Sequence, residues 1–333
     1  MSSLGPYRIG FLLLPDFSYF GLIAAVQPLF LANWRAQRPL FFWSTFSADG
    51  APVRASNGSA VAVDAAIGTR LTLDSMFVLA SFDPKQHAGV ARVRKALLRA
   101  AASGVEIGGI ETGSEVLAAA GLLNGRVAAV HWDNLDGFSE RYPKVMAREQ
   151  LYHAERGRLT CAGGTTVIEM MLYLVAREAG QAVSDEVAQQ MLVGRPRPPT
   201  RRQLTEVDLA QSSQDELVRS AVTLMGKNLD DPLPTPEIAR RLNVSARHLR
   251  RHFRASTGTA TSRYYMRLRL SRAHHLLEQT ELSVTEVAIT SGFRSLEHFS
   301  RVYRAAFGCP PSSDRRQSIT APIDRHQERL RRS

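Results

Sequence analysis

The chain has few cysteines and lacks a long apolar run. Cys161 and Cys309 are the two cysteines in 333 residues, and they lie in different halves, so a disulfide framework is excluded. No run approaches the ~20 apolar residues that a membrane-spanning helix needs. The first apolar run stops at Pro15-Asp16 and has no basic head before it, unlike a signal peptide. We therefore expect a cytoplasmic protein in a reducing compartment, with no membrane association.

Metal-ligand spacing is also missing. The nine histidines and two cysteines do not recur at the short intervals typical of zinc sites. We expect no metal and no cofactor.

Net charge is missing from the first part of the chain and concentrated in the second. Residues 1–194 hold 17 Lys+Arg and 17 Asp+Glu, whereas residues 195–333 hold 25 and 14, so the whole formal charge of +11 (25 minus 14) belongs to the second part. A neutral part joined to a basic part indicates one region that binds a small molecule or a partner and another that meets phosphates.

The basic part contains a repeated pattern. A capped segment, a turn and an inward-facing pair at i, i+4 occur twice, and a glycine follows five residues after the second member of each pair. This spacing predicts a helix, a tight turn and a second helix, which is the plan of a helix-turn-helix DNA reader. The two copies are Thr235–Ala239 with Leu249, Phe253 and Gly258, and Ser283–Ala288 with Phe299, Tyr303 and Gly308.

The second helix of each copy is the predicted reading helix. If its pair of large apolar residues faces inward, the other faces are left for DNA, where arginine can bind guanine or hold a phosphate. Base readout and phosphate contact both stay open for each side chain. The candidates are Ser245, Arg247, Arg250, Arg251 and Arg254 in the first copy, and Ser295, Leu296, Glu297, Ser300 and Arg301 in the second.

A linker helix is predicted over Ser262–Gln279, where apolar residues recur on one face. At 1.5 Å per residue such a helix spans ~26 Å. With the half-widths of two packed units added, the reading helices come near the ~34 Å of one DNA turn. One chain could thus enter two successive major grooves.

Residues 213–315 resemble the DNA-binding domain of AraC/XylS-type regulators. Ala260 stands where that family commonly has proline, and Asp314 where an aromatic is common; both positions concern capping and packing. The resemblance implies a transcriptional regulator whose partners are a double-stranded DNA operator and RNA polymerase. The matching stretches are Ile238-Ala239, Leu249-Arg-Arg-His-Phe253, Arg267-Leu-Arg-Leu-Ser-Arg-Ala273, Gly292-Phe293, Phe299-Ser-Arg-Val-Tyr303 and Phe307-Gly308-Cys-Pro310.

The first 194 residues alternate apolar strands with longer helical patterns, which predicts an α/β domain with a mainly parallel, flavodoxin-like sheet and helices on both faces. The Pro- and Arg-rich run that begins at Arg195 predicts a linker over 195–212. An all-α domain follows over 213–315, and a disordered basic tail over 316–333. The expected strands are Arg8–Leu14, Phe41–Phe46, Met76–Ala80, Val105–Gly109 and Val127–Val130; the expected helices are Tyr19–Gln37, Gln86–Ala102, Thr112–Ala120 and Thr165–Ala179.

Residues Val105–Ser114 run from a strand through a sharp turn into a helix. This is the geometry of a nucleophile elbow, which places one side chain at a strand end beside free helix N–H groups. The residue at the tip is Glu111, in place of a serine or cysteine, and a carboxylate is a poor substitute for a thiolate.

Together with several neighbouring stretches, this elbow resembles the PfpI-like, class I glutamine-amidotransferase-like domain, and the whole chain resembles GlxA-type regulators, which join that domain to an AraC-type reader. In hydrolytic relatives a cysteine occupies the elbow, supported by an acid, but this chain has Glu111 there and Gly21 and Gln27 where acids often occur. We therefore expect no catalytic residue and no enzyme. The other matching stretches are Phe11–Asn33, Val53–Gly58, Leu117–Arg126, Val130–Trp132 and Thr160–Gly164.

The candidate ligand site comprises Glu111, Thr112, His131, Trp132 and Phe17. A carboxylate with aromatic rings beside it suits a small cation. The resemblance points the same way, because some regulators of this type respond to quaternary amines such as betaine or carnitine, or to amino acids such as arginine. It also implies a homodimer and an activator of catabolic genes that responds to a small-molecule effector.

Three alternatives stay open at this point. Glu111 could only cap its own helix, with His131 and Trp132 in structural roles. The protein could be a hydrolase or amidase whose nucleophile is Cys161, although a buried apolar role fits that residue better. It could also be an architectural DNA-binding protein with a vestigial first domain.

Overall fold

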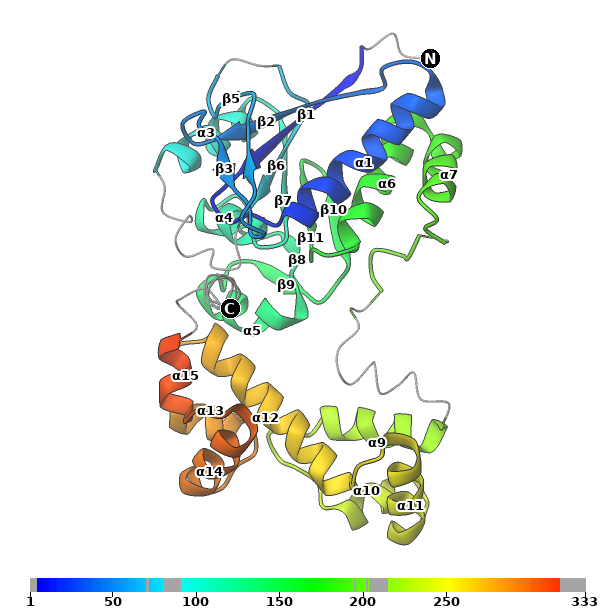
Figure 1. Cartoon of the computed structure of the whole chain (residues 1–333), viewed down its shortest axis with the longest axis vertical. Coiled ribbons are helices and arrows are strands. Elements are labelled where there is room, and N and C mark those ends of the chain that lie inside the picture. The colour runs from blue at the N-terminus through cyan, green and yellow to red at the C-terminus, as the bar shows by residue number, and fades with distance from the viewer. Residues whose placement is uncertain are drawn as a thin grey trace, which may run out of the picture. The chain divides into compact units, whose positions relative to one another are not determined.

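Residues 5–69, 72–80, 91–194, 196–201, 203 and 215–317 are described by the computed structural model of the chain. The chain divides into two compact units, residues 1–203 and residues 204–333 (Figure 1).

The first unit is built on a seven-stranded sheet with the order β10-β11-β7-β6-β1-β2-β5. Neighbouring strands are parallel except for the antiparallel pair β10 and β11, which confirms the predicted, mainly parallel sheet. The strands are β1 (Tyr7–Leu13), β2 (Phe41–Ser47), β5 (Ala65–Ala66), β6 (Ser75–Leu79), β7 (Glu106–Ile110), β10 (Tyr152–Glu155) and β11 (Arg158–Cys161).

One predicted strand lies outside this sheet. Residues 127–130 were expected to join it, but β8 (Val127–Ala129) pairs instead with β9 (Met146–Arg148) in a separate two-stranded sheet. The Ala129 N–H donates to Thr160 Oγ1 at 2.9 Å. This backbone N–H is therefore bonded to a side chain of β11 and not to a backbone carbonyl of the main sheet. A further small sheet joins β3 (Val53–Arg54) to β4 (Ala60–Val61).

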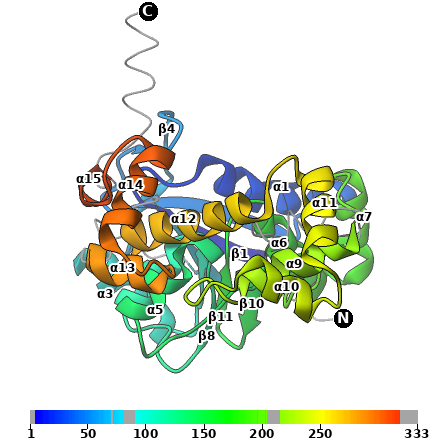
Figure 2. The same cartoon turned by 90° about the horizontal axis from the view of Figure 1, so that it is seen from below.

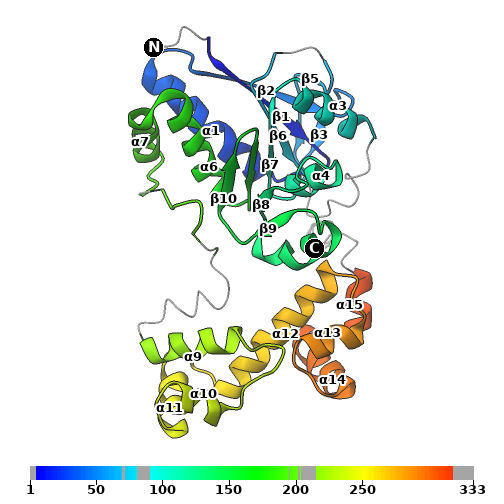
Figure 3. The ribbon, with the colours of Figure 1, turned by 180° about the vertical axis from the view of Figure 1, so that it is seen from behind.

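Helices cover both faces of the large sheet (Figure 3). One face packs on α1, α6 and α7 and the other on α3, α4 and α5, each around its own apolar core. The predicted helix over 86–102 is described from residue 91 onward, and its residues 86–90 lie outside the described part. The helices are α1 (Tyr19–Ala36), α3 (Ala91–Ala102), α4 (Gly113–Ala119), α5 (Leu135–Arg141), α6 (Thr166–Ala179) and α7 (Gln181–Gln190), with a 3-10 turn at Trp132–Asn134.

The first unit continues past the predicted boundary at residue 194. Gln203 Nε2 donates to the carbonyls of Val130 and Gln150, both at 2.7 Å, and the Leu151 N–H donates to the Pro199 carbonyl at 3.1 Å. These bonds satisfy backbone groups at the end of the sheet, so part of the expected linker belongs to this unit. The rest of that linker, residues 204–212, lies outside the described residues.

The second unit consists of helices arranged around two apolar cores, which confirms the predicted all-α reader. The first half of α12 packs in one core with α9, α10 and α11, and its second half packs in the other with α13 and α14 (Figure 2). The predicted tail begins at 316, but α15 runs through Gln317, and residues 318–333 lie outside the described part. The helices are α9 (Glu216–Gly226), α10 (Thr235–Arg241), α11 (Ala246–Thr257), α12 (Thr261–Gln279), α13 (Val284–Thr290), α14 (Leu296–Phe307) and α15 (Pro311–Gln317).

Candidate nucleic-acid interface and strand-end elbow

In the two helix-turn-helix units, α10–α11 and α13–α14, the second helices α11 and α14 repeat each other at an offset of 50 residues. Ser245 caps α11 by accepting from the His248 N–H at 3.1 Å, and Ser295 caps α14 by accepting from the His298 N–H at 3.2 Å. A short polar side chain at this position satisfies one of the free N–H groups that begin a helix. Both reading helices therefore begin with the same local chemistry.

The inward faces also repeat. Leu249 and Phe253 of α11 are fully buried, as are Phe299 and Tyr303 of α14, which confirms the predicted pairs. Gly258 and Gly308 end the two helices with φ of 67° and 78°, a left-handed conformation that favours glycine.

The outward faces present the predicted DNA-contacting side chains. Ser300 is half-buried, and the other predicted residues are exposed: Ser245, Arg247, Arg250, Arg251 and Arg254 on the first unit, and Ser295, Leu296, Glu297 and Arg301 on the second. Exposure leaves these side chains accessible to a DNA groove or to a phosphate.

Sequence reasoning missed a histidine in each unit. His248 Nδ1 lies 3.4 Å from Arg251 Nη2, and His298 Nδ1 lies 3.1 Å from Arg301 Nη2. Each histidine lies one helical turn before its arginine, so the contact orients the guanidinium on the outer face. The 50-residue offset between α11 and α14, applied to every position of the two helices, would have found both histidines. It also pairs Arg254 with the exposed Arg304, which was missed as well.

The two reading units are joined by more than the linker helix. Arg269 of α12 donates from Nε to the Ser291 carbonyl at 2.9 Å and from Nη2 to the Gly292 carbonyl at 2.6 Å. Gly292 lies against the loop that follows α9: a Cβ built there would be 2.5 Å from the Leu229 carbonyl oxygen and 2.6 Å from Pro232 Cδ. The turn of the second helix-turn-helix unit therefore packs directly against the first helix-turn-helix unit. With the 19-residue α12, about 28 Å long at 1.5 Å per residue, this contact fixes the spacing of α11 and α14.

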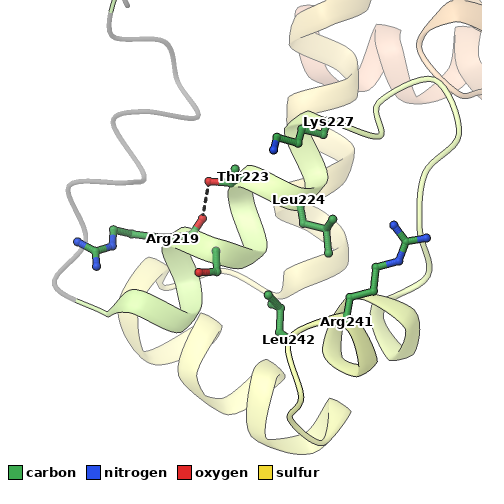
Figure 4. Close-up of a pocket in the computed structure, with 7 residues that line it drawn as sticks. Arg219, Thr223, Leu224, Lys227, Arg241 and Leu242 are labelled. Carbon is green, nitrogen blue, oxygen red and sulfur yellow. Dashed lines mark hydrogen bonds between the residues drawn. The ribbon is translucent and has the colours of Figure 1, made fainter.

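A hollow of about 480 Å³ opens between α9 and α10 (Figure 4). Arg219, Lys227 and Arg241 bring positive charge to it, and Leu224 and Leu242 form an apolar part of its lining. The hollow adds to the cationic surface of the second unit.

In the α/β unit, residues 1–203, glycines allow the chain to turn sharply at the end of β7. A Cβ on Gly113 would lie 2.0 Å from the Val78 carbonyl oxygen, and one on Gly109 would lie 2.6 Å from the Ser114 nitrogen. Only glycine fits at such approaches, so the start of α4 can sit against β6. The predicted elbow geometry follows from these contacts.

Glu111 occupies the tip of this elbow in the left-handed region, with φ of 55°. A residue with a Cβ costs about 1–2 kcal/mol there, and such strain persists where the surroundings impose it, commonly at functional sites. The carboxyl group is hydrogen-bonded to the Ser18 side chain and accepts from the Gly164 N–H at 3.4 Å. Burial raises the pKa of Glu111 from its ordinary value, and these two hydrogen bonds offset part of the rise.

The thiol of Cys161 lies behind the elbow. Cys161 is fully buried, and burial raises its pKa to about 12, although the backbone N–H groups of Glu111 and Gly163 favour the thiolate. A thiol with so high a pKa is almost entirely protonated near neutral pH and is a weak nucleophile. The geometry therefore matches the expected buried apolar role.

The other predicted ligand residues fall into two groups. Thr112 is buried beside Glu111 at the start of α4. Phe17, next to Ser18, is fully buried, and its ring packs in the apolar core. His131 and Trp132 lie 5.4 Å apart by ring centroids just after β8, and the Trp132 N–H donates to Gln203 Oε1 at 2.8 Å. The Glu111 carboxyl group is hydrogen-bonded to Ser18 and Gly164, and its membership of one ligand site with His131 and Trp132 stays a prediction.

Sequence reasoning did not single out Ser18 or the Gly163–Gly164 turn as partners of Glu111. Gln27, offered as the counterpart of a family acid, lies on the exposed side of α1. Contacts between strand ends from distant parts of the chain leave no local signal.

A sheet domain with an elbow, followed by a tandem helix-turn-helix reader, defines a DNA-binding regulator with an attached α/β domain. The family model for a helix-turn-helix domain matches residues 238–317. The chain is 41% identical to the HTH-type transcriptional regulator CdhR of Pseudomonas aeruginosa over 92% of this chain and 90% of that protein. It is 32% identical to the regulator GlxA of Rhizobium meliloti, over 93% and 96%.

Solved structures with a similar fold cover part of the chain. A THiJ/PfpI family protein from Pseudomonas syringae gives a TM-score of 0.52 at 23% identity, over 67% of this chain and 88% of that one. The chain belongs to the AraC family of transcriptional regulators, and its first unit has the fold of the PfpI-like proteins. Among the described residues, no helix is long and apolar enough to cross a membrane.

Proposed function

We propose that this regulator is a cytoplasmic, homodimeric activator whose PfpI-like unit binds a small cationic nitrogen compound. The operator DNA and RNA polymerase are its macromolecular partners, and its effector is a quaternary amine, such as betaine or carnitine, or an amino acid such as arginine. The observation that supports the effector class is Glu111, a half-buried carboxyl group at the strand end where ligands bind in such folds.

A cation suits this carboxyl group for an electrostatic reason. Burial raises the pKa of Glu111 because the ionised form loses solvation, and a bound cation would restore a favourable partner for the charge. Affinity for a cationic effector should therefore rise as the pH rises through the pKa of Glu111. A neutral effector would show no such dependence.

We infer further that the unit does not catalyse hydrolysis. Cys161 is fully buried with a raised pKa, and the elbow position has a carboxyl group where hydrolytic relatives have a cysteine. Turnover of amide or glyoxal substrates that is lost in Cys161→Ala would overturn this inference.

A thermal-shift screen of the full chain against amines and amino acids tests the effector class. A ligand at ~100 times its Kd stabilises the folded state by about 2.7 kcal/mol, or roughly 5–10 °C for a unit of 150–250 residues. Glu111→Gln keeps the size of the side chain and removes its charge, so it should abolish the shift and the effect of the ligand on DNA binding, while DNA affinity without ligand stays unchanged. If the ligand response survives in Glu111→Gln, the carboxylate does not bind the effector. If no amine or amino acid binds, the effector class is wrong.

The DNA-reading residues are tested separately. Arg251→Ala should lower affinity for a specific site by ~1–3 kcal/mol if the guanidinium reads a base. If it holds a phosphate, the loss should be equal on all sequences. Arg301→Ala, at the matching position of the second unit, is the paired variant.

A further inference from the structure

The reading helix of the first helix-turn-helix unit, α11, has two histidines one helical turn apart whose rings stack. The rings of His248 and His252 lie 4.2 Å apart by centroids, with 36° between their planes. His248 Nδ1 also lies 3.4 Å from Arg251 Nη2, and Arg251 is one of the predicted DNA-contacting residues. The stack therefore connects the guanidinium of Arg251 to the side of α11 on which His252 lies.

His252 is held from another helix. Asp215, the residue that caps α9, has its Oδ2 atom 2.9 Å from His252 Nδ1, and the same oxygen accepts from Ser256 Oγ at 3.2 Å. The other oxygen, Oδ1, accepts from the Leu217 N–H at 3.0 Å and from the Val218 N–H at 3.3 Å. One carboxyl group therefore caps α9 and binds α11 at the same time.

The partners of the two rings determine where the ring protons lie. A guanidinium only donates, so His248 Nδ1 accepts from Arg251 and the proton of this ring is on Nε2. A carboxylate only accepts, so His252 Nδ1 carries a proton and donates to Asp215. The hydrogen bond from His252 lowers the pKa of Asp215 below its ordinary value, so the carboxyl group is ionised at neutral pH. Both hydrogen bonds therefore join a donor to an acceptor.

We propose that Asp215 is a positioning residue for DNA reading: through His252 and His248 it holds the Arg251 side chain, and so it sets the base preference of the DNA that α11 contacts. We call that stretch of DNA the α11 sub-site, and the stretch that α14 contacts the α14 sub-site. Both oxygens of Asp215 are occupied within the second unit, so its effect on DNA passes through α11. The proposal rests on the proposed role of Arg251 in base readout.

The physical basis is the ordering of a long side chain before DNA binds. Arg251 is exposed, and an arginine side chain that is free to rotate loses conformational entropy when a DNA groove fixes it. A contact to a histidine ring orients the guanidinium only if that ring is itself held. The stacked ring of His252, fixed by the carboxylate of Asp215, gives His248 this support.

The second helix-turn-helix unit makes the same histidine–arginine contact without such a carboxylate. Val302 stands at the position of α14 that matches His252 of α11. His298 Nδ1 still lies 3.1 Å from Arg301 Nη2, and the ring beside His298 is that of Phe293, at 6.2 Å by centroids. The α14 sub-site should therefore be independent of Asp215, which makes it an internal control within each variant.

The test measures how much base changes in each sub-site lower the DNA affinity of the full chain and its variants. The α11 sub-site is the one whose preference Arg251→Ala relaxes. Asp215→Ser keeps a good cap for α9 and removes the carboxylate from His252. It should lower discrimination in the α11 sub-site by about 2–10-fold, the effect of one lost hydrogen bond, and leave the α14 sub-site unchanged. Asp215→Asn keeps an oxygen that can accept from His252, so it should restore most of the discrimination.

Combined variants separate positioning from a general loss of stability. If Asp215 acts through Arg251, the pair Asp215→Ser and Arg251→Ala should discriminate as well as Arg251→Ala alone. The pair Asp215→Ser and Arg301→Ala should show the two separate losses, one in each sub-site. Thermal unfolding of every variant checks that the second unit folds. If Asp215→Ser does not fold, His252→Phe takes its place, because it keeps a ring and removes the Nδ1 donor, with the same expected results.

Three results would each overturn the proposal while the role of Arg251 stands. They are a folded Asp215→Ser or His252→Phe variant that discriminates as well as the wild type, an equal loss in both sub-sites, and additive losses when either change is combined with Arg251→Ala. If Arg251→Ala changes no base preference, the proposed role of Arg251 fails and the positioning role of Asp215 fails with it. The two failures are therefore distinguishable in one set of measurements.

Discussion

Replacing Gly292 with alanine should uncouple the two reading units, and Gly308 provides a closely matched control. The two glycines have φ of 75° and 78°, and each follows a helix of a helix-turn-helix unit. Alanine costs about 1–2 kcal/mol in this left-handed conformation, at either position. What differs is the space around the new methyl group.

At Gly308 the added Cβ would meet nothing within 4 Å, but at Gly292 it would lie 2.5 Å from the Leu229 carbonyl oxygen and 2.6 Å from Pro232 Cδ. The backbone must move to relieve such contacts, which costs a further ~1–3 kcal/mol in a packed region. Gly292→Ala should therefore destabilise the second unit by about 2–5 kcal/mol in all, against about 1–2 kcal/mol for Gly308→Ala.

Urea unfolding of the full chain can resolve this difference, because all three tryptophans lie within residues 1–203. A transition seen by far-ultraviolet circular dichroism and not by tryptophan fluorescence belongs to the second unit. The movement should also shift α14 relative to α11, so Gly292→Ala should lose about 1–3 kcal/mol of specific DNA affinity, the cost of a mismatched contact. Equal unfolding free energies and equal DNA affinities for the two variants would refute the reasoning.

Three further predictions concern single groups. Gly163→Ala should lower the stability of the first unit more than Gly164→Ala. A Cβ on Gly163 would lie 2.2 Å from Glu111 Cγ, whereas one on Gly164 would meet nothing within 4 Å. Equal thermal unfolding temperatures for the two variants would contradict the elbow geometry. In the native protein iodoacetamide should label Cys309 well before Cys161, whose pKa burial raises to about 12, and mass spectrometry that finds Cys161 labelled without unfolding would argue against this. Hydrogen bonds from Arg240 and Arg241 lower the pKa of Glu237 from 4.5 to about 2, so its contribution to stability is present above pH 4.5 and is lost as the pH falls from there to about 2. Glu237→Gln should flatten the pH dependence of the urea midpoint in that window, and an unchanged profile would exclude the contribution.

The parts of the fold that could be predicted from the sequence have a local signature. The buried pairs at i, i+4 and the serine caps place α11 and α14, and the alternation of apolar runs with helical patterns gives the mainly parallel sheet. These signals depend on residues within a few positions of one another. The repetition of the same pattern predicted the second copy.

What could not be predicted depends on contacts between distant residues. β8 leaves the main sheet because Thr160 accepts a hydrogen bond from Ala129, and Gln203 joins the first unit because it bonds two carbonyls more than 50 residues away. The partners of Glu111 come from the start of α1 and the end of β11 in the same way. Spacing along the sequence gives no sign of such pairings.

The central claim is that α11 and α14 read two successive major grooves from one rigid unit. Selection of the full chain on a pool of randomised DNA duplexes tests it most directly. We expect enriched sites with two sub-sites about 10–10.5 base pairs apart, in which Arg251→Ala relaxes the sequence preference of one sub-site and Arg301→Ala that of the other. Inserting about half a turn of DNA between the sub-sites should abolish specific binding. Enrichment of a single sub-site that is indifferent to Arg301→Ala, or of no sequence at all, would contradict the claim.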